Sequence, residues 1–158
     1  MKRKIFFFLI GILLLILIIS FVFFYNYYLV LTGEEIEIKI PINKNDIFII
    51  SYKHSVALTK VYEYYRIYNN KIILYEMDFY DQCAGLPTEA YNEEKFIMED
   101  GKFKITNMNR EFEYINYGVN SNYEFKLKIN NKEFNLSEIF GTDKVIIRLR
   151  RRLWLMKI

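Results

Sequence analysis

Twenty consecutive residues near the start of the chain, from Ile5 to Phe24, include no charged and no strongly polar side chain. An α-helix rises about 1.5 Å per residue, so a helix over this run would match the hydrocarbon thickness of a bilayer, about 30 Å. We therefore predict a single membrane-spanning helix. No other feature constrains the architecture of the chain as strongly.

The charges around this run predict its orientation. Lys2, Arg3 and Lys4 precede it, and no basic residue follows until Lys39. The positive-inside rule then places residues 1–4 in the cytoplasm and everything after Tyr28 outside it.

A cleaved signal peptide is the alternative to a retained anchor. Such a peptide has a shorter apolar region, which is followed by small residues. Here the apolar run is followed by residues of the kind that line a membrane interface, namely Tyr25, Asn26, Tyr27 and Tyr28. We therefore expect an uncleaved anchor over residues 5–28.

The remainder is one domain in size, and we place a β domain at 34–150 and a basic, apolar tail at 151–158. Isoleucine, tyrosine and phenylalanine are frequent, whereas alanine occurs only three times, which favours strands over helices. The single cysteine, Cys83, excludes an internal disulfide. Between Lys4 and Arg148 the chain has 14 basic and 19 acidic residues, a net charge of −5. This balance argues against nucleic-acid binding, which needs clustered cations.

Alternation of apolar and polar residues with a period of two indicates half-buried strands. Two Asn-Asn pairs and one Asp-Gly pair consist of residues that tolerate a positive φ. They predict three hairpin turns, at Asn69-Asn70, Asp100-Gly101 and Asn130-Asn131. No βαβ pattern is visible, so we predict an all-β domain, an antiparallel β-sandwich or barrel. The expected strands are 35–42, 46–52, 59–68, 71–79, 95–99, 102–106, 111–115, 123–129, 132–136 and 144–149.

One stretch, residues 81–89, breaks the strand pattern. Gly85 and Pro87 are typical of a loop, and we read the stretch as a connection between sheets. The alternative is that the loop enters a short helical turn at Thr88 to Asn92 and presents backbone N–H groups to an anion or a partner.

Five short motifs occur in order along the chain: Lys53-His54-Ser55-Val56, Val61-Tyr62-Glu63-Tyr64-Tyr65, Cys83-Ala84-Gly85-Leu86-Pro87, Glu99-Asp100-Gly101 and Asn107-Met108-Asn109-Arg110. Together, over Ile49 to Arg150, they resemble the bacterial domain of unknown function 1850. The resemblance implies a small exported or membrane-anchored β domain. It also implies a gene often found beside the fused membrane subunit of a TAXI-type tripartite ATP-independent periplasmic (TRAP) transporter.

His54 and Ser55 do not form a promising nucleophile pair, because neighbours on an extended strand point to opposite faces. If the turn after His54 spans residues 56–58, Glu63 lies across the hairpin and can accept a proton from the imidazole. A His54–Glu63 pair would be structural or responsive to pH.

Cys83 and His54 are a thiolate–imidazolium pair in principle, but nothing in the local sequence places them together, so we expect an inert Cys83. One histidine and one cysteine also supply too few ligands for zinc. Arg110 has two interpretations: an ion pair with Glu63 or a loop acid, or a contact to a ligand carboxylate. The basic C-terminal residues can lie on anionic lipid, dock on a transporter subunit, or face solvent.

We therefore expect a non-enzymatic accessory or binding module of a membrane transport system, outside the cytoplasm, without cofactor or metal. One alternative is a module whose Gly85–Pro87 loop and Arg110 hold a small carboxylate or a peptide. The other is an enzyme that uses His54 with Cys83 or Glu63. The candidate functional residues are His54, Ser55, Glu63, Gly85, Leu86, Pro87, Asn109 and Arg110.

Overall fold

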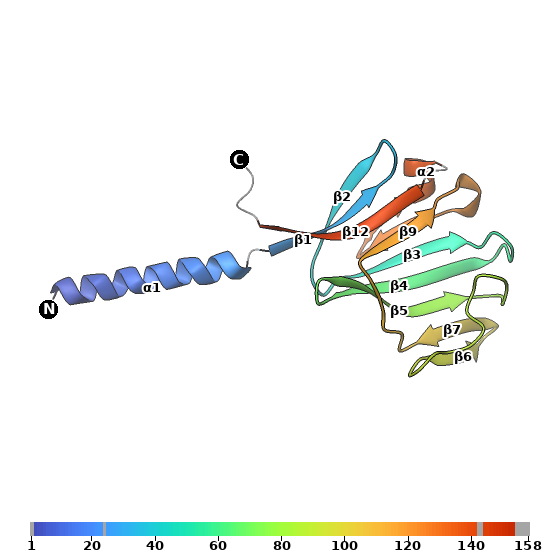
Figure 1. Ribbon diagram of the computed structural model, residues 1–158, viewed down its shortest axis with the longest axis horizontal. Coiled ribbons are helices and arrows are strands. Elements are labelled where there is room, and N and C mark those ends of the chain that lie inside the picture. Colours follow the sequence, from blue (N-terminus) through green and yellow to red (C-terminus); the bar gives the residue numbers. More distant parts are fainter. Residues whose placement is uncertain (1, 24, 142–143, 154–158) are drawn as a thin grey trace.

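The computed structural model describes residues 2–23, 25–141 and 144–153. It consists of one long helix, α1 (Lys2–Phe23), and a β domain that extends away from the end of that helix (Figure 1). In α1, side chains are described for Arg3 and for residues 5–17. Counting described residues only, no helix combines the length and the hydropathy that a membrane span requires.

The domain is all-β, and every strand pair in it is antiparallel. The smaller sheet has the strand order β2-β1-β12-β9. These strands are β1 (Tyr25–Thr32), β2 (Glu37–Ile42), β9 (Tyr114–Gly118) and β12 (Lys144–Leu153).

The larger sheet has the order β11-β10-β3-β4-β5-β7-β6, with β8 also paired to β5. Two short helices, η1 (Ser121–Tyr123) and α2 (Leu136–Phe140), flank β10 and β11 in the sequence. The strands are β3 (Ile47–Lys53), β4 (Lys60–Tyr68), β5 (Lys71–Phe79), β6 (Lys95–Glu99), β7 (Lys102–Thr106), β8 (Arg110–Phe112), β10 (Lys126–Ile129) and β11 (Lys132–Asn135).

The hydrophobic core lies between the two sheets. In β3 and β4 alternate residues point into it, as the period-two pattern predicts, whereas β5 buries consecutive residues. The fully buried side chains include Leu29 and Leu31 of β1, Phe48 and Ile50 of β3, Val61 of β4, and Val145 and Ile147 of β12.

The predicted all-β class and all three hairpins are confirmed. Asn69, Asn70, Asp100, Gly101 and Asn130 have a positive φ, which is the backbone conformation that the turn residues were expected to adopt. The strands predicted at 71–79, 95–99 and 102–106 are found with those boundaries.

The other seven predicted strands have different limits. Those predicted at 35–42, 46–52, 59–68 and 144–149 are found at 37–42, 47–53, 60–68 and 144–153. The one at 111–115 is two short strands in different sheets, β8 and β9. The one at 123–129 begins only at Lys126, because η1 and a left-handed Glu124 precede it. The one at 132–136 stops at Asn135, whose side chain caps α2 by accepting a hydrogen bond from the Glu138 N–H.

The N-terminal boundary also differs from the expected one. Residues 25–28, expected to end the anchor, belong to β1, and the β domain starts there rather than at residue 34. β1 pairs with both β12 and β2, because its run of aromatic and aliphatic residues suits the middle of a sheet. Of the expected tail, Arg151 to Leu153 continue β12, and residues 154–158 lie outside the described residues.

Candidate functional site

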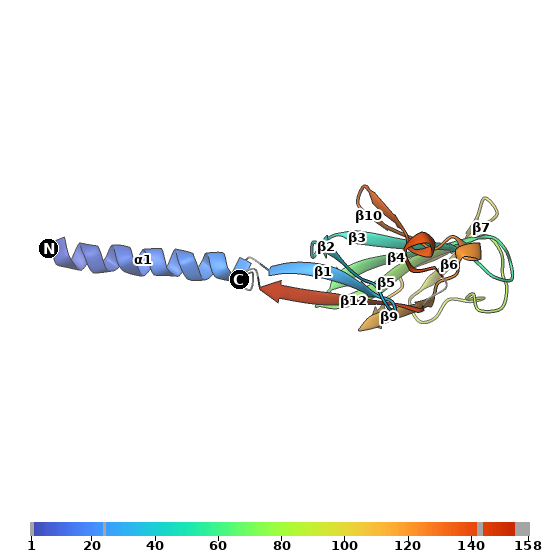
Figure 2. The same ribbon diagram turned by 90° about the horizontal axis from the view of Figure 1, so that it is seen from above.

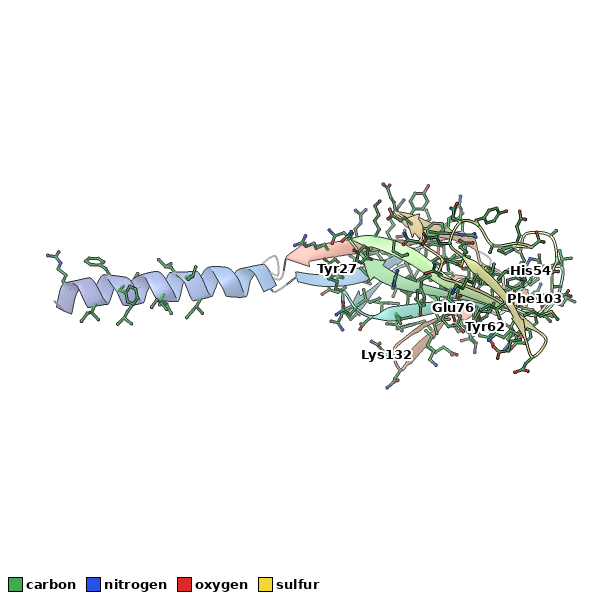
Figure 3. The ribbon with its side chains drawn as sticks, turned by 90° about the horizontal axis from the view of Figure 1, so that it is seen from below. Tyr27, His54, Tyr62, Glu76, Phe103 and Lys132 are labelled. Carbon is green, nitrogen blue, oxygen red and sulfur yellow. The ribbon has the colours of Figure 1, made fainter. Side chains whose placement is uncertain are left out.

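His54 begins the turn between β3 and β4, at the end of the domain farthest from α1 (Figure 3). The turn closes through backbone hydrogen bonds from His54 N–H to Thr59 O (2.8 Å) and from Leu58 N–H to His54 O (2.9 Å). The backbone N–H groups of Val56 and Ala57 both donate to His54 Nδ1, at 3.3 Å. Nδ1 is therefore an acceptor, which places the imidazole proton on Nε2.

The loop after β5 brings Cys83 to this histidine. The Cys83 sulfur lies 3.3 Å from Nδ1 and 3.9 Å from Nε2 of His54. Gly85, at φ +93°, lies against the same ring: a Cβ there would be 3.6 Å from Nε2. The His-Ser-Val and Gly-Leu-Pro motifs therefore meet in space, and they bring together Cys83 and His54, a contact that the local sequence did not indicate.

The other residues of these two motifs have different surroundings. Ser55 is exposed on the turn. Leu86 is buried in the core, and its N–H donates to Cys83 O at 3.0 Å. Pro87 is half-buried. Residues 88–92 form bends and a turn rather than the helical turn considered above, and Asn92 has φ +57°.

Glu63 is not the partner of His54, which corrects the predicted pair. The β3–β4 register sets Glu63 opposite Ile50 and Tyr52 opposite Val61. The turn occupies residues 54–59, longer than the expected 56–58, so His54 lies beyond the last paired residues.

Glu63 is instead a buried carboxylate between the two sheets. Tyr52 donates to Oε1 (3.1 Å), Tyr65 donates to Oε2 (2.8 Å), and Tyr117 also donates to Oε2. The hydroxyls of Tyr65 and Tyr117 lie 2.9 Å apart. Tyr117 belongs to β9 of the smaller sheet, so this cluster joins the two sheets by polar contacts.

Burial raises the pKa of Glu63, although the three tyrosine hydroxyls lower it in part. Burial, and then the nearby Glu63 carboxylate, also raise the pKa of Tyr52, Tyr65 and Tyr117. Cys83 adds to the effect on Tyr52. The Cys83 sulfur is therefore near Tyr52, at one end of the buried cluster.

Arg110 lies elsewhere, in a pocket of about 790 Å³ on the larger sheet. Its Nε and Nη2 donate to the two oxygens of Glu94, both at 2.8 Å, which is the ion pair with a loop acid that the sequence allowed. The hydrogen bond from Arg110 lowers the pKa of Glu94. The pocket is lined by Arg66, Tyr68, Tyr91, Asn92, Glu93, Glu94, Asn107, Met108, Asn109 and Arg110.

Local contacts fix the shape of this pocket. Asn107, at φ +60°, donates from Nδ2 to the backbone oxygen of Glu93 at 2.8 Å. The Met108 N–H donates to Tyr75 O at 3.1 Å, and Tyr75 is the extra residue of a β-bulge in β5. The Arg110 guanidinium lies 5.6 Å from the centre of the Tyr91 ring. Asn109 is exposed at the pocket wall.

The predicted site residues therefore fall into two regions, one at the far end of the domain and one around Arg110. The sequence interpretation missed the tyrosine partners of Glu63, and it named the ion-pair partner of Arg110 only as Glu63 or a loop acid. The period-two pattern of β4 did indicate that Glu63 is buried, because it put Glu63 on the same face of the strand as Val61 and Tyr65. Among the described residues, no three histidine, cysteine or acidic side chains gather as a metal site.

Comparison with known proteins identifies the family. One family model matches residues 48–136, more than half of the chain, and this range contains the His54 turn, Glu63 and the Arg110 pocket. No curated protein and no solved structure matches the chain. Because the matched range covers most of the β domain, the chain belongs to the family described as Domain of unknown function (DUF1850).

Proposed function

We propose that the protein is a membrane-anchored domain that acts outside the cytoplasm as an accessory or binding module of a TRAP-type transport system. The observation that carries this proposal is α1. Its 22 residues are continuous in helix, and its described apolar side chains, such as Phe8 (69% exposed) and Leu17 (60% exposed), do not pack on the β domain. An apolar helix without a protein partner is stable in lipid and unstable in water.

The orientation follows from the cations at the start of α1. Lys2, Arg3 and Lys4 favour the cytoplasmic side for that end, so the β domain lies on the other side. A tethered domain reaches a membrane-embedded partner at a high effective concentration, so it needs no tight affinity for that partner. The transporter partnership rests on the gene neighbourhood that the family resemblance implies.

Two experiments test this proposal. Protease added to intact spheroplasts is expected to digest the β domain, whereas inverted vesicles should protect it. Purification in mild detergent from cells that also express the TRAP membrane subunit is expected to recover that subunit. Digestion only in inverted vesicles would refute the orientation, and repeated purification of the protein alone would refute the stable complex.

A second function, binding of a small carboxylate, is favoured by the pocket around Arg110. Arg110 donates to Glu94 from Nε and Nη2. The N–H groups of Nη1 are therefore left to bind a ligand. Arg66 lies on the same pocket and has no ion pair among the described residues. Two guanidinium groups beside the Tyr68 and Tyr91 rings suit a planar carboxylate.

The ligand test uses thermal denaturation with acetate and succinate as probes. Stabilisation by succinate that is lost in both Arg66→Gln and Arg110→Ala, and kept in the matched variant Lys126→Gln outside the pocket, would support a carboxylate site. The alternative in which the Gly85–Pro87 loop shares this site with Arg110 does not fit, because Gly85 lies against His54 instead. Equal shifts in all variants would show that the pocket does not bind these probes.

A further inference from the structure

The smaller sheet carries a group of arginines beside the end of α1. Tyr25, the first residue of β1, follows the last residue of α1 after a single intervening residue. β12 runs antiparallel to β1, so its C-terminal half returns to the same place, with Arg150 opposite Tyr28 and Arg151 opposite Tyr27. Figures 1 and 2 show β1 and β12 continuing along the direction of α1, with the tip of β12 next to the helix.

The pairing sets the distance of these arginines from the helix. Tyr28 is three residues beyond Tyr25, which is about 10 Å along a strand. The headgroup layer of a bilayer is about 5–8 Å thick on each side of the hydrocarbon. Arg150 and Arg151 are exposed, and arginine side chains are long enough to reach back toward a charged layer. Arg148, opposite Val30, is two residues farther away, and its guanidinium lies 5.3 Å from the centre of the Tyr114 ring.

The local chemistry suits an anionic surface. Among the described residues, Arg150 takes part in no ion pair, and the neighbouring cation Lys39 pairs only with Glu37 of the same strand. Tyr28 stands opposite Arg150, and tyrosine is typical of the membrane interface; Tyr27, opposite Arg151, donates its hydroxyl hydrogen to Asn70 Oδ1. A guanidinium group donates two parallel hydrogen bonds to a phosphate, which makes it a good ligand for lipid headgroups.

We propose that Arg150 and Arg151, at the C-terminal end of β12, bind the phosphates of anionic lipids in the outer headgroup layer and hold the β domain upright on the membrane. The inference rests on the membrane anchoring proposed above. It adds a second, electrostatic contact that is far from α1 in sequence and close to it in space.

The test is chemical footprinting of the full chain in lipid nanodiscs. Phenylglyoxal modifies accessible arginines, and mass spectrometry gives the rate for each residue. In discs with phosphatidylglycerol, Arg150 and Arg151 are expected to react at least about five-fold more slowly than in discs of phosphatidylcholine alone. Arg148 should change less, and Arg66, exposed on the larger sheet, should not change. A concentration of 0.5 M NaCl should remove the difference, because salt screens the charges.

Variants complete the test. Arg150→Gln should restore part of the reactivity of Arg151 in anionic discs, whereas Lys60→Gln, the same charge change beside the His54 turn, should not. Equal rates in the two kinds of disc would overturn the lipid contact, whether both rates are fast, as in solvent, or slow, as under a protein partner. If the full chain fails to enter discs at all, the anchor is refuted and the lipid contact with it; insertion with equal rates refutes the lipid contact alone.

Discussion

The sulfur of Cys83 lies 3.3 Å from Nδ1 of His54, although the two residues are 29 positions apart in the sequence. The contact requires the β3–β4 turn and the loop after β5 to meet at one end of the larger sheet. Gly85 makes this possible, because its backbone adopts φ +93°, a conformation that glycine takes without strain. Two motifs of the family are therefore parts of a single structural unit.

The Cys83 thiol should be more reactive with His54 present than without it. The thiol can donate to Nδ1 in competition with the Val56 and Ala57 N–H groups, and transfer of its proton leaves the thiolate, which is the nucleophile. We expect His54→Ala to slow alkylation of Cys83 by iodoacetamide at neutral pH by about ten-fold. Ser55→Ala, a change on the same exposed turn, is the matched control and should leave the rate unchanged. Equal rates in the wild type and in His54→Ala would show that the imidazole does not activate the sulfur.

Gly85→Ala should destabilise the domain by about 1–2 kcal/mol, because an L-residue adopts this positive φ only with strain. The new Cβ would meet His54 at an ordinary contact distance, so the cost lies in the backbone. Urea denaturation of the full chain in mild detergent measures the loss. Gly118→Ala is the control: it has open space and no positive φ, and should leave the stability nearly unchanged or raise it slightly. If the two variants lose stability equally, the backbone argument is wrong.

The buried Glu63 predicts that the domain becomes less stable as the pH rises. Its pKa in the folded state is raised above the ordinary value near 4.5, so the folded state keeps the proton longer than the unfolded state does. Stability is therefore greatest below pH 4.5 as far as this group is concerned, and it falls as the pH rises through the folded pKa. Each unit of the raised pKa corresponds to about 1.4 kcal/mol.

Glu63→Gln isolates this effect, because glutamine is nearly isosteric and carries no charge. Its stability, measured by urea denaturation from pH 4.5 to 8, should fall less with pH than that of the wild type. Glu89→Gln, at an exposed position, should follow the wild-type curve. Parallel curves for the wild type and Glu63→Gln would mean that ionisation of Glu63 carries no cost.

The Arg110–Glu94 pair predicts the opposite dependence at low pH. The pKa of Glu94 is lowered in the folded state, so its contribution is complete above the ordinary value near 4.5 and is lost as the pH falls through the folded value. We expect Glu94→Gln to cost about 1 kcal/mol at pH 7, since Arg110 is partly in solvent, and to cost nothing at pH 2. Thermal denaturation across this range checks it. Glu93→Gln, the neighbouring carboxylate, should have little effect at either pH.

Much of the β domain could be predicted because its strands alternate clearly and its turns use residues that tolerate a positive φ. The 71–79 strand and the 95–106 hairpin are examples, since both their pattern and their turn residues agree. β1 was missed because its aromatic residues follow an apolar helix directly and suit a membrane interface as well as a strand. Sequence patterns do not distinguish these environments, and only pairing with β12 does.

The candidate sites were predicted less well, because each depends on contacts between distant segments. Arg110 with an acid of the loop was foreseen from residue types, and Glu94 is that acid. The pairing of His54 with Glu63 failed because it assumed a shorter turn. The Cys83–His54 contact and the Tyr117–Glu63 contact join residues 29 and 54 positions apart, and local spacing carries no information about them.

The position of β12 has a consequence for how the protein matures. This last strand lies between β1 and β9 in the smaller sheet, so it fills the centre of that sheet rather than an edge. β1 is synthesised long before β12, so one of its edges stays unpaired until β12 follows. Closure of the sandwich must therefore wait for β12, and a nascent chain that lacks this strand should remain open to chaperones and proteases.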